Sequence, residues 1–398
     1  MSNFFKIFSI ALASILSFST LCFSASCKDE TQATYFPMVV IAQADASQDG
    51  KPSIDANQAE DVEIALLTGD IYTVCADYEK YVTNDYNPNK IDVFAPTPIK
   101  ITWTSEETPN YCEFLISTKN DMSNPVVYMV NGCSVTLENL FMGYDYYYQI
   151  YAKFDDKLVK SRIFKFTTEY LPRTVFWGEN ISNTRDWGGY YTVDGKHRVK
   201  QGIVYRGGKL EDITKAEKSR ILGVFGIKTD LDLRKDGTGS GSSPLGADVN
   251  YVELLGPYYL GGTGIDFGAS LHEDRLAYKQ ALIDEIKVFA NPDNFPVYVH
   301  CSLGRDRTGT LCFLINALLG VGETDLYRDY EISMMSKMGR LDNQTSSNMV
   351  RTFSSLYNYI LNFIPGNTLA ENAEAYMLSI GITQAEIDAI KVNMLEKV

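Results

Sequence analysis

The sequence predicts an all-β sandwich followed by an α/β domain, in which helices flank a mostly parallel sheet. Its 398 residues exceed what one ordinary core contains, so two domains are expected. The composition changes near Leu171-Pro172-Arg173. Before this point the chain is rich in tyrosine and in short alternating runs, and after it apolar residues recur with helical periods. We therefore expect the domains to be residues 59–170 and 171–398.

Residues 1–26 have the pattern of a secretory signal peptide, which predicts a secreted or cell-surface protein. A short basic start ending at Lys6 precedes an uncharged apolar stretch, and Ser24-Ala25-Ser26 supplies a small-residue cleavage site. Cys27 follows, but no leucine stands three residues before it, so a lipid anchor at Cys27 is disfavoured. The polar residues 27–58 predict a flexible segment.

Residues 59–170 predict a β-sandwich because short runs of alternating apolar and polar residues recur at regular spacing. The predicted strands are Ile99–Thr104, Tyr111–Ser117, Val126–Val130, Ser134–Leu137, Tyr146–Lys153 and Arg162–Thr168. Cys112 and Cys133 each have apolar neighbours at period two. Two readings of this pair stay open, a disulfide bond and two core thiols.

Residues 171–398 predict the α/β domain, because alternating strands and helices favour a parallel sheet covered on both faces. The predicted strands are Thr229–Leu233 and Val297–His300, and the predicted helices are Thr214–Gly223, Leu271–Phe289, Thr308–Leu319, Glu323–Lys337, Ser346–Phe363 and Thr383–Glu396. Ligands of such sheets bind at the carboxyl ends of the strands. The glycine-rich stretches Gly237–Ser243 and Gly256–Gly268 are either plain loops or mobile lids.

The segment after the strand Val297–His300 predicts a phosphate-binding loop. Cys301 ends the strand, Gly304 lies in a tight loop, and Arg307 opens a long apolar helix. Loop N–H groups and the positive end of the helix would converge on a tetrahedral dianion such as a phosphoryl group. Gly304 lets the loop curl, and Arg307 offers a planar fork for two phosphoryl oxygens.

The same dipoles converge on Cys301, so we expect the pKa of its thiol to be lowered. We expect the thiolate to attack phosphorus and to form a cysteinyl-phosphate, which water then hydrolyses. Thr308 would hydrogen-bond the sulfur and help it leave. His300 is expected to brace the loop rather than to act as a base, because an ionised cysteine needs no base.

This loop resembles that of the cysteine-based protein-tyrosine phosphatases, in the branch of bacterial and fungal tyrosine and lipid phosphatases whose loop reads His-Cys-x-x-Gly-Lys-Asp-Arg-Thr-Gly. Four further blocks are similar to motifs of that branch and follow in the same order: Asn183–Tyr190, Gly202–Gly208, Ile227–Arg234 and Asp329–Ser333. The resemblance runs from about Thr174 to the C-terminus. It implies an α/β phosphatase that needs no cofactor.

The upstream domain resembles a fibronectin type III module. The resemblance covers about Ala59–Thr168 and rests on Trp103 and on the spacing of Leu140, Gly143 and Tyr146, with Tyr146 in the tyrosine-corner position. Such a module is more often a spacer or a binding platform than a catalyst. We expect it to contact a protein or a glycan, if it binds a partner.

The resemblance also implies the residues that bind the substrate, which are Ser302, Leu303, Gly304, Arg305, Asp232, Arg185 and Asp186. Two features depart from the branch. Arg305 stands where the branch has lysine, and the run Gly237–Ser243 stands where it has an acidic residue. For Arg185 and Arg206 two roles stay open, added positive potential at the site and structural ion pairs.

The resemblance nominates Asp306 as the general acid that protonates the leaving group. Its position between Arg305 and Arg307 favours the ionised carboxylate, unless burial or a bound dianion acts against it. Asp266, Glu273 and Asp274, in the stretch before the catalytic strand, are the competing candidates. Asp232 is a helper that would line the pocket.

Net charge and histidine content exclude two classes of partner. A net charge of −14 argues against nucleic acid binding. The three histidines, His197, His272 and His300, have no ligand spacing, so we predict no metal. Three functions remain: a phosphatase of phosphotyrosine proteins, a phosphatase of phosphoinositides or inositol phosphates, and an adhesion or binding protein with a silent phosphatase domain. The complete loop favours the first two.

Overall fold

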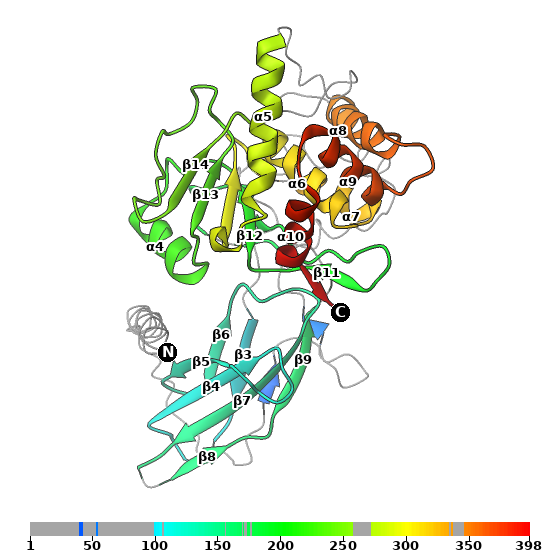
Figure 1. Ribbon diagram of the computed structural model, residues 1–398. Helices are drawn as coiled ribbons and strands as arrows, with labels where there is room; N and C mark the ends of the chain where they lie inside the picture. Colours follow the sequence, from blue (N-terminus) through cyan, green and yellow to red (C-terminus); the bar gives the residue numbers. More distant parts are fainter. Residues whose placement is uncertain are drawn as a thin grey trace. The chain divides into compact units, whose positions relative to one another are not determined.

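The computed structural model describes residues 99–105, 107–155, 157–168, 170, 173–175, 177–257, 272–333, 336 and 346–398, with the backbone alone at 40–42, 53–54, 272–277, 331 and 346–352. The chain divides into two compact units, one containing Thr97–Leu171 and the other Pro172–Val398 (Figure 1). The predicted signal peptide lies outside the described residues, as does most of Gly256–Gly268.

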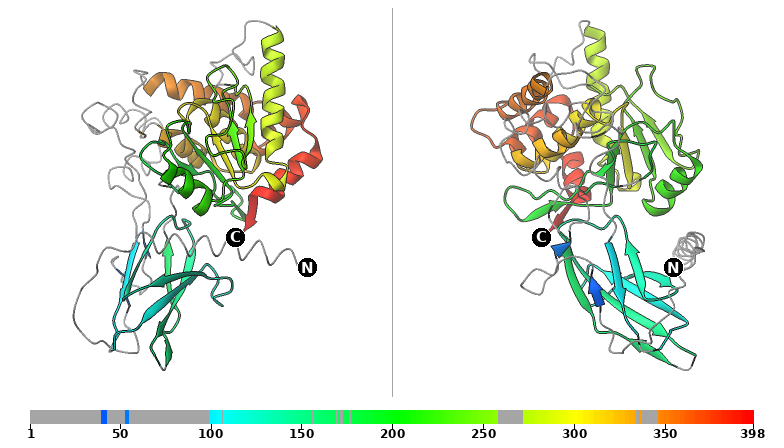
Figure 2. Two further views of the ribbon diagram at one scale, coloured as in Figure 1. Left: turned by 90° about the vertical axis from the view of Figure 1, so that its left-hand side faces the viewer. Right: turned by 180° about the vertical axis from the view of Figure 1, so that it is seen from behind.

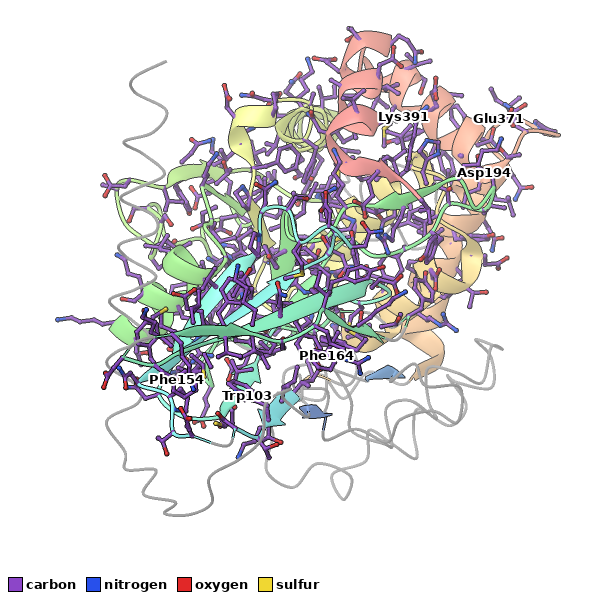
Figure 3. All side chains as sticks on the ribbon, turned by 90° about the horizontal axis from the view of Figure 1, so that it is seen from below. Trp103, Phe154, Phe164, Asp194, Glu371 and Lys391 are labelled. Carbon is purple, nitrogen blue, oxygen red and sulfur yellow. The ribbon has the colours of Figure 1, made fainter. Side chains whose placement is uncertain are left out.

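The first unit consists of two mainly antiparallel sheets with the strand orders β1-β3-β6 and β2-β9-β7-β4-β5, and β8 pairs with β7. The strands are β1 (Val40–Ala42), β2 (Ser53–Ile54), β3 (Ile99–Trp103), β4 (Tyr111–Ser117), β5 (Val126–Val130), β6 (Ser134–Leu137), β7 (Asp145–Lys153), β8 (Leu158–Lys160) and β9 (Phe164–Thr168). Alternate residues of β7 are buried, as the alternating sequence predicts. Residues of both sheets, including Trp103 and Phe114, form one core, which also contains Phe154 (Figure 3).

Two local features of this unit bear on the predictions. The Tyr146 hydroxyl accepts a hydrogen bond from the Phe141 N–H at 2.7 Å, so the tyrosine fixes the turn before its own strand. Cys112 is buried, Cys133 is partly buried, and both thiols are free. Burial raises the pKa of Cys112 to about 12, and the neighbouring Cys133 acts in the same direction. Of the two readings for this pair, the structure shows free thiols.

The second unit contains a five-stranded sheet in the order β10-β12-β15-β13-β14. Its strands are β10 (Arg185–Asp186), β12 (Val204–Gly207), β13 (Thr229–Asp232), β14 (Asn250–Glu253) and β15 (Val297–His300). The last four run parallel, and β10 pairs antiparallel to β12. A separate antiparallel pair joins β11 (His197–Val199) to β16 (Leu395–Lys397). The predicted mostly parallel sheet is confirmed.

Helices cover both faces of this sheet (Figure 2). They are α4 (Lys215–Val224), α5 (His272–Val288), α6 (Asp306–Leu318), α7 (Glu323–Ile332), α8 (Ser346–Leu361), α9 (Leu369–Ile380) and α10 (Gln384–Met394). Successive side chains of β15 point to opposite faces of the sheet, so they join different hydrophobic cores. Tyr298 joins a core with Ile221 of α4, whereas Val299 joins a core with Ile286 of α5 and Leu311 of α6.

The predicted and observed elements differ in several places. β15 has the predicted bounds, but α6 begins at Asp306 instead of Thr308, so Arg307 lies in its first turn. The strand β14 and the helix α9 were not predicted. α10 ends at Met394 because Leu395–Lys397 leaves the helix to pair with β11.

Candidate active site

The loop of residues 301–305 connects β15 to α6 at the carboxyl end of a central strand, where ligands of parallel sheets bind. Cys301 is 3% exposed at its start. Gly304 has φ +68°, and a Cβ at this position would lie 2.1 Å from the Gly207 carbonyl oxygen. Both the backbone conformation and the close approach of β12 therefore require glycine here.

Three successive carbonyl groups of the loop are held from outside it. Ser302 O accepts from the Lys209 N–H at 3.2 Å, Leu303 O from Asn183 Nδ2 at 3.0 Å, and Gly304 O from Arg206 Nη2 at 2.7 Å. In a trans peptide the N–H points opposite to the carbonyl group. The N–H groups of the three following residues therefore point to the other side of the loop, where an anion would bind.

A buried charge cluster supports the loop from below. Asp329 of α7 accepts from Arg185 Nε at 2.9 Å and also pairs with Arg206 Nη1. Burial alone would raise the pKa of Asp329, but the guanidinium groups of Arg206 and Arg185 outweigh it and lower the pKa. Of the two roles left open for these arginines, the structure shows ion pairing.

Three residues that we expected to bind substrate are enclosed in ion pairs instead. Arg185 is 0% exposed and pairs with Asp329. Asp186 is 1% exposed, and its Oδ2 lies 2.5 Å from Arg173 Nη1. Asp232 is 0% exposed, with both carboxylate oxygens 2.7 Å from Arg234 nitrogens. The structure therefore shows Arg185, Asp186 and Asp232 in structural ion pairs, and their role in substrate binding stays a prediction.

Cys301 has the electrostatic surroundings of a reactive thiol. Burial raises the pKa of Cys301, and Asp306 also raises it. The polar groups of Thr308 and the charge of Arg307 act in the opposite direction, and the net pKa of Cys301 lies below its ordinary value. Thr308 is fully buried, which strengthens its effect on the sulfur.

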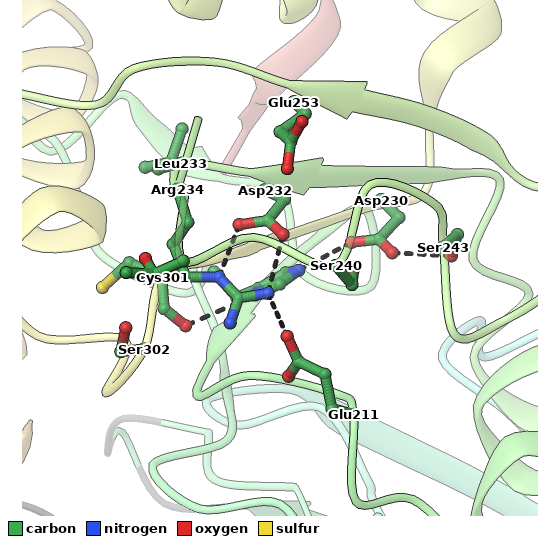
Figure 4. A network of polar contacts seen from close by, with 12 residues as sticks. Glu211, Asp230, Asp232, Leu233, Arg234, Ser240, Ser243, Glu253, Cys301 and Ser302 are labelled. Atoms are coloured by element: carbon green, nitrogen blue, oxygen red, sulfur yellow. Dashed lines mark hydrogen bonds and ion pairs between the residues drawn. The ribbon is translucent and has the colours of Figure 1, made fainter. Parts of the chain in front are cut away.

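His300 is the last residue of β15, directly before the loop. Its Nε2 is 2.9 Å from Asp230 Oδ1, and Ser243 Oγ donates to the other oxygen of Asp230 at 2.6 Å. Burial lowers the pKa of His300, but the Asp230 carboxylate outweighs it and raises the pKa. This is the geometry of a brace. Figure 4 shows Asp230 and Ser243 on one side of this network and Arg234 between Asp232 and Glu211 on the other.

Arg307 is held by a residue that the sequence analysis missed. Its Nη1 lies 2.7 Å from Asp236 Oδ2 and 3.1 Å from Leu233 O, and its Nη2 lies 3.3 Å from Ser302 Oγ. We expected the run Gly237–Ser243 to replace an acidic residue after Arg234. Asp236 is acidic, stands two residues after Arg234 and forms an ion pair with Arg307. That expectation was therefore wrong.

Asp306 lies in the first turn of α6, and its side chain is 30% exposed. Arg305, which is 3% exposed, donates to it from Nε at 3.1 Å. The Arg305 side chain is thus paired with its neighbour Asp306. Of the competing general acids, Asp266 lies outside the described residues, and Glu273 and Asp274 are described only by their backbone.

Two searches of the described residues give negative results. No group of three or more histidine, cysteine, aspartate or glutamate side chains in the ranges given above could hold a metal ion. In the same part of the chain, no helix is both long and apolar enough to cross a membrane.

A model of the tyrosine phosphatase family matches residues 178–396. The chain belongs to this family. It is similar to a Dictyostelium discoideum protein that carries the name tyrosine-protein phosphatase DG1060, with 33% identity over 17% of this chain and 40% of that protein. It is also similar to a Cupriavidus necator protein named as a tyrosine-protein phosphatase, H16_A0669, with 27% identity over 38% of this chain and 60% of that protein. The matched region thus spans less than two thirds of either curated relative.

Among solved structures, the chain is similar to the core catalytic domain of the S. cerevisiae PP-IP phosphatase SIW14 in complex with citrate. The identity is 14%, the match covers 39% of this chain and 89% of that one, and the TM-score is 0.26. A second structure, of the Siw14 catalytic core, matches with 16% identity over 38% of this chain and 88% of that one, at a TM-score of 0.23.

Proposed function

We propose that the protein hydrolyses phosphate monoesters through a cysteinyl-phosphate on Cys301, with phosphotyrosine in proteins as the preferred substrate. The observation that carries the proposal is the loop itself. A sulfur of lowered pKa lies beside Arg307, in a loop with three successive carbonyl groups bonded to donors outside it. A phosphoryl dianion meets N–H donors, a guanidinium group and a nucleophile at one point.

The reaction would take place in two steps. In the first, the Cys301 thiolate forms a bond to phosphorus while the bond to the phenolic oxygen breaks, and that oxygen takes a proton from the general acid. In the second, water attacks phosphorus, the sulfur–phosphorus bond breaks, and inorganic phosphate leaves. Thr308 then stabilises the departing thiolate, because its polar groups lower the pKa of that sulfur.

Asp306 is the residue that we propose as the general acid. Asp230 and Asp232 are 0% exposed, and Asp236 holds the loop arginine Arg307, whereas Asp306 is 30% exposed and pairs with Arg305. Burial raises the pKa of Asp236, but Thr238 and Arg307 outweigh burial and lower the pKa, which disfavours Asp236 as a proton donor. Asp306→Asn should therefore slow phenyl phosphate far more than an ester whose leaving group is already acidic. An equal loss on both esters would remove Asp306 from this role.

Cys301→Ser tests the proposal directly. This variant should lose turnover of a phosphotyrosine peptide while still binding tungstate, because the loop donors remain. Undiminished turnover would refute the cysteinyl-phosphate mechanism. Measuring the wild-type protein on phosphoinositides as well separates the protein phosphatase from the alternative lipid or inositol phosphate phosphatase. A protein that binds tungstate and hydrolyses neither would fit the third reading, a binding protein.

We further propose that the first unit is a fibronectin type III-like module and that the protein is exported. The hydrogen bond from the Phe141 N–H to the Tyr146 hydroxyl supports the module, since a tyrosine at this corner is typical of such sandwiches. The apolar stretch that ends in Ser24-Ala25-Ser26 supports export. Fractionation of expressing cells tests the second point, because a protein retained in the cytoplasm would contradict it.

A further inference from the structure

Asn183 has a backbone conformation that residues other than glycine rarely adopt. Its φ is +61°, and the residue is 0% exposed. Such a conformation costs free energy and persists only where the surrounding contacts fix it. Both neighbours are fixed in this way. Ser182 O accepts from the Gly208 N–H at 2.9 Å, which holds the residue before. Thr184 Oγ1 donates to Val175 O at 2.7 Å, which holds the residue after. The fold therefore keeps Asn183 strained, and this conformation decides where its amide group points.

The contacts of the Asn183 amide group fix its orientation. Oδ1 accepts from Arg185 Nη1 at 2.5 Å. Nδ2 lies 3.0 Å from Leu303 O and 3.2 Å from Ser333 Oγ, so its two hydrogens have two acceptors. Turning the amide by half a turn would place its NH2 group against a guanidinium group and its oxygen against a carbonyl oxygen. The side chain therefore donates to the phosphate loop and cannot accept from it.

The hydrogen bond to Leu303 O fixes a peptide group that its own residues would leave free to rotate. Leu303 is followed by Gly304, which has φ +68°, and glycine adopts positive and negative φ about equally readily. A half-turn of this peptide would bring its carbonyl oxygen to the side where the anion binds and would take its N–H away from that side. An N–H stabilises a bound oxyanion, whereas a carbonyl oxygen repels it.

We propose that Asn183 is a positioning residue, which holds the Leu303–Gly304 peptide with its N–H toward the bound anion. This inference rests on the proposed function, because it concerns the same anion site. Asn183 touches neither the anion nor the reacting sulfur in this arrangement. It acts through the loop backbone, and the strain at its own backbone is the consequence of placing the amide opposite Leu303 O.

Asn183→Asp tests this role with a side chain of the same size. The new carboxylate still accepts from Arg185 Nη1, but it has no hydrogen to donate to Leu303 O. The fold should tolerate its charge, because two guanidinium groups, those of Arg185 and Arg206, pair with one carboxylate of Asp329. The carboxylate repels the carbonyl oxygen and attracts an N–H in its place, so the peptide should turn. We expect kcat/KM for a phosphotyrosine peptide to fall at least about 100-fold, as when one donor to an oxyanion is removed. Tungstate affinity, measured by calorimetry, should fall as well.

Three further variants separate positioning from a purely structural role. Ser333→Ala removes an acceptor of Asn183 Nδ2 and of Arg185 Nη2, but it leaves the bond to Leu303 O. It should lower the melting temperature and keep tungstate affinity. Asn183→Gly accepts φ +61° without strain and removes the amide, so it should fold and still lose tungstate affinity. Asn124→Gly is the matched control at an exposed residue of the first unit with φ +50°, and it should bind tungstate as wild type does.

Tungstate affinity equal to that of wild type in either folded variant of Asn183 would overturn the inference. An equal loss in Ser333→Ala would do the same, because the buried cluster and not the bond to Leu303 O would then control the loop. Failure of both Asn183 variants to fold would also count against it, since the amide would then hold the fold rather than one peptide. Tungstate binding needs no turnover. A wild-type protein that binds tungstate but cleaves no ester, with affinity still lost in the Asn183 variants, would therefore contradict the proposed function alone. Absence of tungstate binding in the wild-type protein would contradict both.

Discussion

Asp236 Oδ2 lies 2.7 Å from Arg307 Nη1, although 71 residues separate them in the chain. The contact joins the segment that follows β13 to the first turn of α6. It fixes the arginine that would bind two phosphoryl oxygens. The same Nη1 also donates to Leu233 O, and Nη2 donates to Ser302 Oγ. Arg307 is thus oriented before any ligand arrives, which reduces the entropy lost on binding.

Asp236→Asn should lower kcat/KM by about 10- to 100-fold, because a hydrogen bond to a charged group contributes about 1.5–3 kcal/mol. The loss should appear both in turnover of a phosphotyrosine peptide and in affinity for tungstate. Asp248→Asn, at an exposed carboxylate in the same region, is the matched control and should change neither quantity. Equal behaviour of the two variants would show that Asp236 does not orient Arg307.

Gly304→Ala should lower kcat/KM at least about 100-fold, since a displacement of the reacting groups by 1 Å has that effect. The added Cβ would lie 2.1 Å from Gly207 O, so the loop must move. Gly241→Ala is the control, because Gly241 has nearly the same φ, +69°, but nothing within 4 Å of the new Cβ. It should lose only about 1 kcal/mol of stability and keep its activity. An active Gly304→Ala variant would contradict the tight approach to β12.

Thr308→Val should shift the ionisation of Cys301 to higher pH. The thiolate forms above the thiol pKa, and the polar groups of Thr308 lower that pKa. The rate of alkylation by iodoacetamide, measured against pH, should therefore rise at a higher pH in the variant than in wild type. Thr310→Val is the control, because the Thr310 hydroxyl donates to Asp306 O and not to the sulfur. Coincident curves for all three proteins would exclude the role of Thr308.

Asp329→Asn should destabilise the second unit by about 3–5 kcal/mol, because it leaves two buried guanidinium groups without their counter-ion. Asp325→Asn, which breaks a pair with Arg328 on the same helix, should cost about 0–1 kcal/mol. Thermal unfolding measures both. The pKa of Asp329 is lowered in the fold, so its contribution exists above the ordinary carboxyl pKa and is lost as pH falls through the folded value. Equal melting points would contradict the role of the cluster.

Much of the fold could be predicted because periodicity and motif order act locally. β15 has its predicted bounds, and so does β4 in the first unit. The helix α9 was missed although its signals are present: Thr368 and Glu371 form a capping box, and Gly381 ends the helix with φ +113°. A capping box and a glycine at this spacing mark the two ends of a helix, so the sequence contained enough information to predict α9.

The site was predictable only in part. Cys301, Gly304 and Arg307 lie in one short segment, so their proximity follows from the sequence. Whether a charged residue faces the ligand or another charged residue depends on contacts between distant segments. Arg185 and Asp329 are 144 residues apart, and no local pattern distinguishes such a pair from two ligand-binding residues.

From Arg307 to Leu318, every residue of α6 is buried, and three carbonyl groups before this helix accept hydrogen bonds from Asn183 and from the segment 206–209. Remodelling the anion cradle would therefore disturb the interior of the whole unit. Diversification among relatives should leave the cradle unchanged and act on the rim, where new side chains can select new phosphate esters without costing stability.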